Sequence, residues 1–205
     1  AGGGRVIVPP GIWVTGPIQL QSYIALHIQK GGVLLFSDNY QDFPLIETNW
    51  EGETCVRAMP PIYGSGLTNI AITGQGIIDG SGHVWRPVKR FKMTDRQWRV
   101  LITSGGVLNE TGDIWWPTEG ALNGSNFLQQ QAQKKNVILA DYEPIRVYLR
   151  PVMIGLNQCK HILLDGPTFQ NSPAWNIHPL KCENLIVRNI NVRNPWFSQN
   201  GDGID

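Results

Sequence analysis

The chain has 205 residues and a formal net charge of +1, with 17 Lys and Arg against 16 Asp and Glu. A dedicated nucleic-acid-binding protein usually carries a basic excess, so this balance argues against that class. Hydrophobic residues make up 41% of the chain, which is enough for a core. No apolar run reaches the ~18 residues that a membrane helix needs. We expect a folded domain, or a piece of one, that has neither nucleic acid nor membrane as its partner.

The three cysteines, Cys55, Cys159 and Cys182, are too few for a disulfide framework. None of them has a neighbour at metal-ligand spacing, so we expect no zinc site, no other metal and no cofactor. The odd number leaves at least one free thiol, and we expect all three side chains to be packed as small hydrophobic groups.

Short segments rich in β-branched residues predict strands, with almost no helix between them. They are bounded by Gly, Pro or Asn. In chain order they are residues 6–8, 24–28, 33–36, 70–73, 152–154, 162–164, 175–178, 185–187 and 190–192. Such a series favours a β-sandwich, a barrel or a β-solenoid.

A 23-residue offset distinguishes among these architectures, because it aligns similar residues in the C-terminal part of the chain. The aligned pairs are Ile154/Ile177, Cys159/Cys182, Ile162/Leu185, Leu164/Val187, Phe169/Val192 and Asn171/Asn194. Asn69, His161 and Asn184 also precede apolar strands at equivalent places. Equivalent residues of a solenoid stack about 4.8 Å apart and form a continuous core. The repeat therefore predicts an all-β fold, a parallel β-helix, which should be right-handed by the crossover rule.

Residues 83–148 interrupt this pattern and predict a partly helical insertion within a single domain. A capping box at Thr94–Gln97 indicates the start of one helix, and Gly105–Gly106 its end. A second helix is predicted to begin at Ser125, and the aromatic loop 113–117 lies between the two. Two roles stay open for the insertion, which either lies beside a cleft or only shields the solenoid.

Four motifs occur in order along the chain. They are GQGIIDG at 74–80 with Trp85 nearby, RP at 150–151, NSPAWNIHP at 171–179 and NGDGID at 200–205. Each is weak alone, but in register with the repeat they resemble the polygalacturonase family, glycoside hydrolase family 28, over nearly the whole chain. The resemblance implies a pectin-lyase-like right-handed β-helix. It also implies hydrolysis of α-linked galacturonic acid in pectin, with inversion.

The last motif carries the predicted catalytic carboxylates. The family usually reads Asn-Thr-Asp-Gly-x-Asp here, and Gly201 stands in place of Thr. The resemblance makes Asp202 a carboxylate that helps to activate the attacking water, and Asp205 a supporting one. Inversion suits this arrangement, since it needs an acid and a base roughly 6.5–9.5 Å apart with water between them. The alternative is a turn whose Asp and Gly serve only backbone geometry.

Stacking gives a second reason to single out this region. If Ile204 lies under Ile177, Asp205 lies under His178. Residues next to an inward-facing side chain on a strand point outward. The substrate-binding residues predicted on this face are Asn176, His178 and Asn200, although a lone histidine is more often structural.

Aromatic and basic residues of the insertion suit a sugar polyanion. We predict Trp115 and Trp116 to be substrate-binding residues that stack on sugar rings, although most buried tryptophans only pack. The basic run from Arg86 to Arg99 would attract pectin. The alternative for this run is a solvated helix face.

Some family features are missing from the chain. These are a paired Asp-Asp that supplies the general acid, a Gly-His-Gly segment, an Arg-x-Lys clamp and an N-terminal capping helix. The chain starts at Ala1 without an initiator Met or the apolar core of a signal peptide. We expect residues 1–205 to be an N-terminal portion of a longer secreted, extracellular or periplasmic enzyme, and to be inactive alone.

Two other functions remain open. The first is a β-helix that binds polysaccharide without cleaving it. The second is a calcium-dependent enzyme like pectate lyase, which the hydrolase-type motifs disfavour. The expected partner in each case is a pectic polysaccharide or an oligogalacturonide, and the oligomeric state is open.

Overall fold

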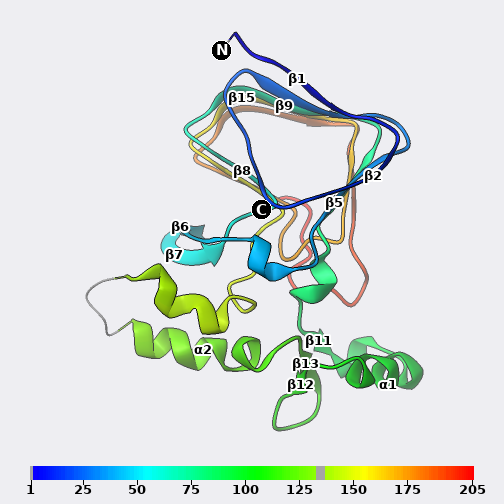
Figure 1. Ribbon diagram of the computed structural model, residues 1–205, viewed down its shortest axis with the longest axis vertical. Coiled ribbons are helices and arrows are strands. Elements are labelled where there is room, and N and C mark those ends of the chain that lie inside the picture. Colours follow the sequence, from blue (N-terminus) through cyan, green and yellow to red (C-terminus); the bar gives the residue numbers. More distant parts are fainter. Residues whose placement is uncertain (1, 133–136) are drawn as a thin grey trace.

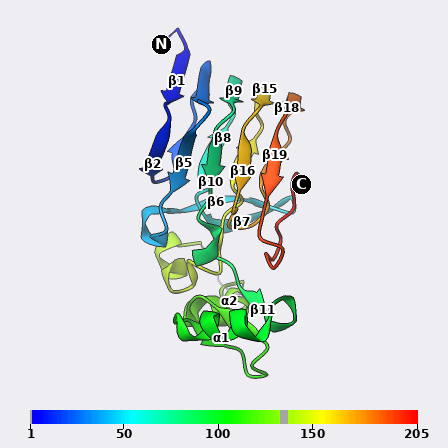
Figure 2. The ribbon, with the colours of Figure 1, turned by 90° about the vertical axis from the view of Figure 1, so that its right-hand side faces the viewer.

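The computed structural model describes residues 2–132 and 137–205. Most of its strands pair in parallel and wind into a solenoid with three faces, each of which is a sheet. Viewed along the solenoid axis, the coils superimpose as a triangle (Figure 1). From the side, the strands follow one another from the N-terminal to the C-terminal coil (Figure 2). The predicted parallel β-helix is confirmed.

The three faces are called sheets 1, 2 and 3. Sheet 1 contains, in order, β1 (Gly4–Val8), β4 (Ile24–Ile28), β9 (Thr68–Gly74), β15 (Lys160–Asp165) and β18 (Glu183–Arg188). Sheet 2 contains β2 (Gly11–Thr15), β5 (Gly32–Phe36), β10 (Ile77–Asp79), β16 (Thr168–Gln170) and β19 (Asn191–Arg193). Sheet 3 contains β3 (Ile18–Gln19), β8 (Ile62–Ser65), β14 (Ile154–Asn157) and β17 (Ile177–Leu180).

Apolar residues of successive coils stack in columns inside the solenoid. In sheet 3, Ile62 pairs with Ile154, which pairs with Ile177, and all three side chains are fully buried. Burial of each such side chain contributes about 1.5–3 kcal/mol. Three more of the predicted pairs are in register: Ile162/Leu185, Leu164/Val187 and Phe169/Val192.

The tight turns between sheets also repeat. Asn69, His161 and Asn184 occupy one register position and share a left-handed backbone, with φ of 53°, 54° and 53°. Asn tolerates this conformation better than most residues, because its short side chain bonds locally. The predicted equivalence of these three positions is confirmed.

The cysteines are free, as expected. Cys159 and Cys182 precede the paired residues Lys160 and Glu183, so they are neighbours in adjacent coils. Cys159 is buried, whereas Cys182 is only half-buried, so the predicted interior position holds fully for Cys159 alone.

Two long excursions leave the solenoid between sheets 2 and 3. The first includes η1 (Tyr40–Asp42) and a hairpin of β6 (Leu45–Trp50) and β7 (Glu53–Ala58). The sequence analysis did not predict this hairpin. Its two turn residues, Glu51 and Gly52, have φ of 52° and 84°, and two successive left-handed residues are typical of a type I′ hairpin turn.

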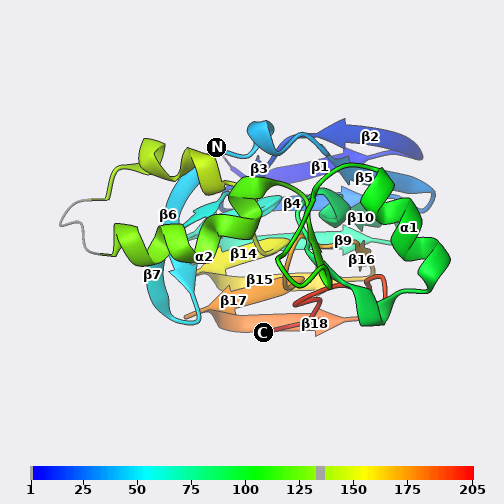
Figure 3. The same cartoon turned by 90° about the horizontal axis from the view of Figure 1, so that it is seen from below.

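The second excursion joins β10 to β14 and includes the predicted insertion. Its elements are η2 (Gly82–Val84), β11 (Val88–Lys89), η3 (Arg90–Lys92), α1 (Asp95–Thr103), β12 (Val107–Leu108), β13 (Ile114–Trp116), α2 (Glu119–Gln131) and η4 (Leu139–Ile145). Its two α-helices lie on the same side of the solenoid as the hairpin (Figure 3). Among the described residues, no helix has the length and apolarity to span a membrane.

The helix boundaries partly match the prediction. The capping box of Thr94 and Gln97 forms at the start of α1, as predicted. The start of α2 was predicted wrongly, since the helix begins at Glu119 rather than at Ser125. The hydroxyl of Thr118 accepts a hydrogen bond from the Ala121 N–H and caps the helix, so Ser125 lies within it.

Arg86 anchors the insertion to the solenoid. Its side chain is buried, and Nη1 donates to the carbonyl of Ser172 at 2.9 Å while Nη2 donates to Oδ1 of Asn171 at 2.6 Å. Arg86 therefore belongs neither to a solvated helix face nor to an exposed basic surface, which corrects the reading of the basic run at this residue.

Candidate active site

On the outer face of sheet 3, the residues that directly follow the inward-facing isoleucines form one column. Tyr63 of β8, Gly155 of β14 and His178 of β17 are in register. Below them, Ile204 forms a parallel bridge with Ile177. Asp205 therefore follows His178 in this column, and its N–H donates to the Ile177 carbonyl at 3.0 Å. The predicted stacking of Ile204 under Ile177 is confirmed.

The backbone of Asp202 is held in place while its side chain is exposed. Its carbonyl accepts hydrogen bonds from the Asn176 N–H at 2.9 Å and from Asn176 Nδ2 at 3.1 Å. Within the described residues, no hydrogen bond reaches the carboxylate of Asp202 or of Asp205. Both carboxylates are therefore free to meet water or a ligand at the surface.

Asn176 does not have the exposed position that strand alternation predicted. Its side chain is completely buried, because the segment around Asp202 packs over it. Alternation holds within a regular strand, whereas Asn176 precedes the first residue of β17. Asn176 therefore positions Asp202 from the preceding coil.

His178 lies half-buried beside the aromatic ring of Trp175, with ring centroids 5.5 Å apart. Burial lowers the pKa of His178, and the charge of Asp205 opposes this by raising it. The neutral imidazole is thus favoured, and it has one N–H donor and one nitrogen acceptor for a polar ligand.

Asn200 belongs to the loop that leads to Asp202, and Arg150 fixes this loop. Arg150 Nη2 donates to Oδ1 of Asn200 at 2.5 Å, and Nη1 donates to the carbonyls of Gln199 at 3.0 Å and Pro173 at 3.3 Å. The amide oxygen of Asn200 is therefore engaged with Arg150. Sequence analysis included Arg150 in a motif but assigned it no role.

The two adjacent tryptophans of the insertion have different environments. Trp115 is buried against Val88 and Trp98, and its Nε1 donates to the Gly105 carbonyl at 2.7 Å. The prediction that Trp115 stacks on sugar is therefore wrong, since the ring forms the small core of the insertion. Trp116 is half-buried and lines a cavity near Arg150, so it remains a candidate.

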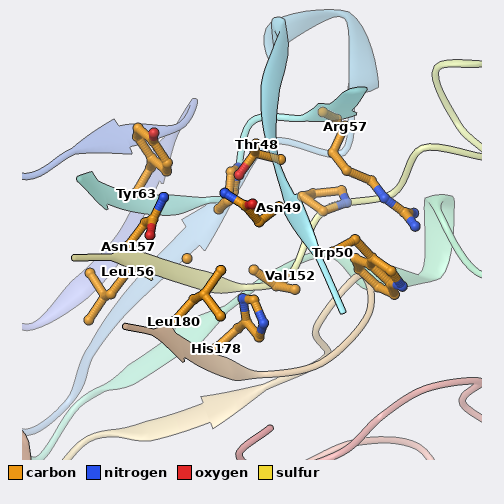
Figure 4. A pocket seen from close by; sticks show the side chains of 14 residues that line it. Thr48, Asn49, Trp50, Arg57, Tyr63, Val152, Leu156, Asn157, His178 and Leu180 are labelled. Carbon is orange, nitrogen blue, oxygen red and sulfur yellow. The ribbon is translucent and has the colours of Figure 1, made fainter. Parts of the chain in front are cut away.

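The β6–β7 hairpin closes one end of the outer face of sheet 3. Figure 4 shows its strand crossing above β14 and β17, with His178 on the opposite side of the gap. The space between the hairpin and Tyr63, Gly155 and His178 has a volume of about 20 Å³. One buried water needs at least about 10–15 Å³, so a sugar ring cannot enter there. Asp205 lies on the other side of His178, in the next coil.

The sequence analysis assigned no role to three residues near this closed end. Trp50 stacks on Trp175 with centroids 4.0 Å apart, and the guanidinium of Arg57 lies 3.7 Å from the centroid of the Trp50 ring. The third is Arg150. The hairpin turn at Glu51–Gly52 is the signal that could have located Trp50 and Arg57.

The fold and the site together define a parallel β-helix with a candidate carboxylate centre on one outer face. In the described part of the chain, no cluster of three or more His, Cys, Asp or Glu residues could hold a metal ion. No family model matches the chain.

Related proteins specify this class further. The chain is 28% identical over 210 residues to a probable polygalacturonase from Vitis vinifera. It is 24% identical over 217 residues to an exo-poly-α-D-galacturonosidase from Dickeya chrysanthemi. These alignments cover 100% and 99% of this chain but 32% and 33% of the relatives, so the chain spans about a third of their length.

Solved structures agree with these relatives. The exopolygalacturonase of Thermotoga maritima superposes on the whole chain with a TM-score of 0.73 and 30% identity, over 42% of its own length. A family 28 exopolygalacturonase of Yersinia enterocolitica has the same fold, with a TM-score of 0.64, 22% identity and 35% of its length covered. The homologues of this chain are polygalacturonases and exopolygalacturonases, and the solenoid is right-handed like theirs.

Proposed function

We propose that the protein hydrolyses α-linked galacturonic acid residues of pectin, with Asp202 as the carboxylate that activates water. The observation that carries this proposal is the pairing of Ile204 with Ile177, which sets Asp205 beside His178 at the edge of sheet 3, while Asn176 holds the backbone of Asp202 nearby. Similarity to polygalacturonases over the full chain supports it. Such a substrate implies action outside the cytoplasm, in a secreted protein.

The chemistry follows from the free carboxylates. An inverting hydrolase needs a base that accepts a proton from water and an acid that protonates the glycosidic oxygen. Asp202 supplies the base and Asp205 supports it through its charge. His178, as a neutral ring, hydrogen-bonds a sugar hydroxyl. The resemblance to the polygalacturonase family assigns the general acid to a motif that follows Asp205.

We also propose that cleavage starts from a chain end. The space over Tyr63 and Gly155 is too small for a sugar, so a polymer cannot run past His178 toward the N-terminal coils. Three of the four relatives described above are exo-acting by name. A groove closed at one side favours binding of the terminal residues of the polymer.

Product analysis tests this function. We expect the complete protein to release reducing ends from polygalacturonate without ultraviolet-absorbing products, and to release only short oligomers or monomers from the start. Ultraviolet-absorbing products would indicate a lyase, and binding without new reducing ends would indicate a non-catalytic polysaccharide-binding protein. A broad ladder of long oligomers at early times would contradict exo action.

A further inference from the structure

The side chain of Asn194, directly after β19, forms hydrogen bonds through both its oxygen and its nitrogen. Its Oδ1 accepts from the Ser172 N–H at 2.9 Å, and its Nδ2 donates to the Gly201 carbonyl at 2.9 Å. Nδ2 also donates to Oγ of Ser172 at 3.0 Å. Asn194 therefore joins the loop that carries Asp202 to the preceding coil of the solenoid.

Ser172 is a firm attachment point for this bridge. It is fully buried, its hydroxyl donates to the Ala174 carbonyl, and its own carbonyl accepts from Nη1 of Arg86 at 2.9 Å. Together with the bond from its N–H to Asn194, every polar group of Ser172 has a partner. Movement of Ser172 would leave buried polar groups unpaired, which is costly, so its position is well defined.

The bond from Asn194 complements the bonds from Asn176. The Gly201 carbonyl belongs to the peptide group before the Asp202 Cα, and the Asp202 carbonyl belongs to the peptide group after it. Asn194 holds the first of these groups and Asn176 holds the second. Because each peptide group is planar, fixing both leaves little freedom in φ and ψ of Asp202. The two asparagines together therefore set the direction of the Asp202 Cα–Cβ bond.

The absence of a side chain at Gly201 leaves room for this bridge. A Cβ on Gly201 would lie 3.0 Å from Nδ2 of Asn194, 3.3 Å from Cβ of Ser198 and 3.4 Å from Cβ of Asn194. The first two contacts are tighter than ordinary van der Waals contact, so a side chain there would displace the amide of Asn194. The family motif that this chain resembles usually has Thr at this position, whereas this chain combines Gly201 with Asn194.

We propose that Asn194 is a positioning residue for hydrolysis, which acts through the Gly201 carbonyl on the Asp202 carboxylate. This inference rests on the proposed function, because it concerns the same carboxylate. In this role Asn194 supports the chemical step and not substrate affinity. A reacting group displaced by about 1 Å costs about 10²-fold in rate, so the loss of this bond is measurable as a fall in kcat.

Steady-state kinetics of reducing-end release by the complete protein test the proposal. Asn194→Ala removes the donor to the Gly201 carbonyl, so we expect kcat to fall by about 10- to 100-fold and KM to change by less than about twofold. Asn189→Ala is the matched control, because it also removes a side-chain hydrogen bond in the same coil, from Nδ2 to Oδ1 of Asp165. It should keep the wild-type kcat even where its melting temperature falls. A wild-type kcat in Asn194→Ala, or a loss confined to KM, overturns the proposal.

Gly201→Ala tests the same bridge from its other end. Its Cβ would displace the Asn194 amide, so we expect kcat to fall by at least about tenfold in the wild-type background. In the Asn194→Ala background the same change should cost no more than about threefold, because the two substitutions remove one interaction. Equal losses in both backgrounds would contradict the shared role. If Asn194→Ala does not fold, Gly201→Ala decides, and a wild-type kcat in that variant overturns the proposal.

A crystal structure of Asn194→Ala separates this inference from the proposed function, because it does not depend on activity. We expect the Asp202 carboxylate to move by about 1 Å, or its B-factor to rise to about 60 Å², which is a displacement of about 0.9 Å per axis. Such a change in a protein whose wild type releases no reducing ends would keep the positioning role and refute the hydrolase. Hydrolysis with an ordered, unshifted Asp202 in the variant would keep the hydrolase and refute the positioning role.

Discussion

The segment around Asp202 has a fixed backbone and a free carboxylate. Asn176 donates twice to the Asp202 carbonyl, and Arg150 bonds the two residues that come before Gly201. A general base must keep a defined position while its carboxylate oxygens stay free of hydrogen bonds from the protein, because those oxygens accept the proton. The hydrogen bonds therefore fix the chain and leave the Asp202 carboxylate open, as its proposed role as a base requires.

His178 provides a test of the charge arrangement at this site. Burial lowers its pKa and Asp205 raises it, so Asp205→Asn should lower the pKa of His178 further. An NMR titration of the imidazole C–H signals measures this, with Asp95→Asn in α1 as the control that should leave the value unchanged. A higher pKa in Asp205→Asn would contradict the assigned geometry.

The lowered pKa of His178 also sets a pH dependence of stability. The unfolded value is about 6.5, and the folded value lies below it. Unfolding therefore takes up a proton in the interval between the two values. The contribution of His178 to stability is present above pH ~6.5 and is lost as the pH falls through the folded pKa.

His161 is the residue of its turn column least suited to a left-handed backbone. Asn69 and Asn184 occupy the same register position with the same φ. His161→Asn should therefore raise the free energy of unfolding by about 0.5–1 kcal/mol. Urea denaturation measures the change, and Lys30→Asn, in an exposed turn with negative φ, is the control. A loss of stability in His161→Asn would contradict the backbone assignment.

At another set of stacked turns, glycines determine how closely adjacent coils approach each other. Gly74 and Gly166 follow the paired residues Thr73 and Asp165, and both have positive φ. A Cβ on Gly166 would lie 2.2 Å from the Gly74 carbonyl oxygen. The turn therefore requires glycine for both conformation and space.

Gly166→Ala should lower the free energy of unfolding by about 3 kcal/mol or more, since it combines backbone strain with a clash. Gly4→Ala is a matched control, because its Cβ would first meet Ile24 Cδ1 at 4.0 Å and its φ is not positive. Thermal denaturation of both variants checks the difference. Equal melting temperatures would mean that the coils do not stack as described.

The regular elements were predictable from the sequence because coil stacking and helix capping each leave a pattern of residues at fixed spacing. The 23-residue offset reports coil stacking, and the Thr94 capping box reports the start of α1. Trp115 and Asn176 were not predictable, because their burial depends on which segment packs over them. The hairpin from Leu45 to Ala58 was missed because only its Glu51–Gly52 turn carries a local signal.

In the whole molecule, the longest connections lie at the corner where the chain passes from sheet 2 to sheet 3. The hairpin and the insertion leave the solenoid there in two successive coils, and the loop that carries Asp202 leaves it two coils further on. Short turns join the sheets elsewhere. The long connections at the corner between sheets 2 and 3 flank the outer face of sheet 3. The β-helix thus acts as a scaffold for a site made mostly of loops.

The rate of reducing-end release from polygalacturonate by the complete protein and its Asp202→Asn variant tests the central claim. The amide keeps the shape of the side chain but cannot accept the proton of water, so we expect the rate to fall by about 10²–10⁴-fold. Asp205→Asn should lower it less, and oligogalacturonide binding should persist in both variants. A near-normal rate for Asp202→Asn would contradict the account.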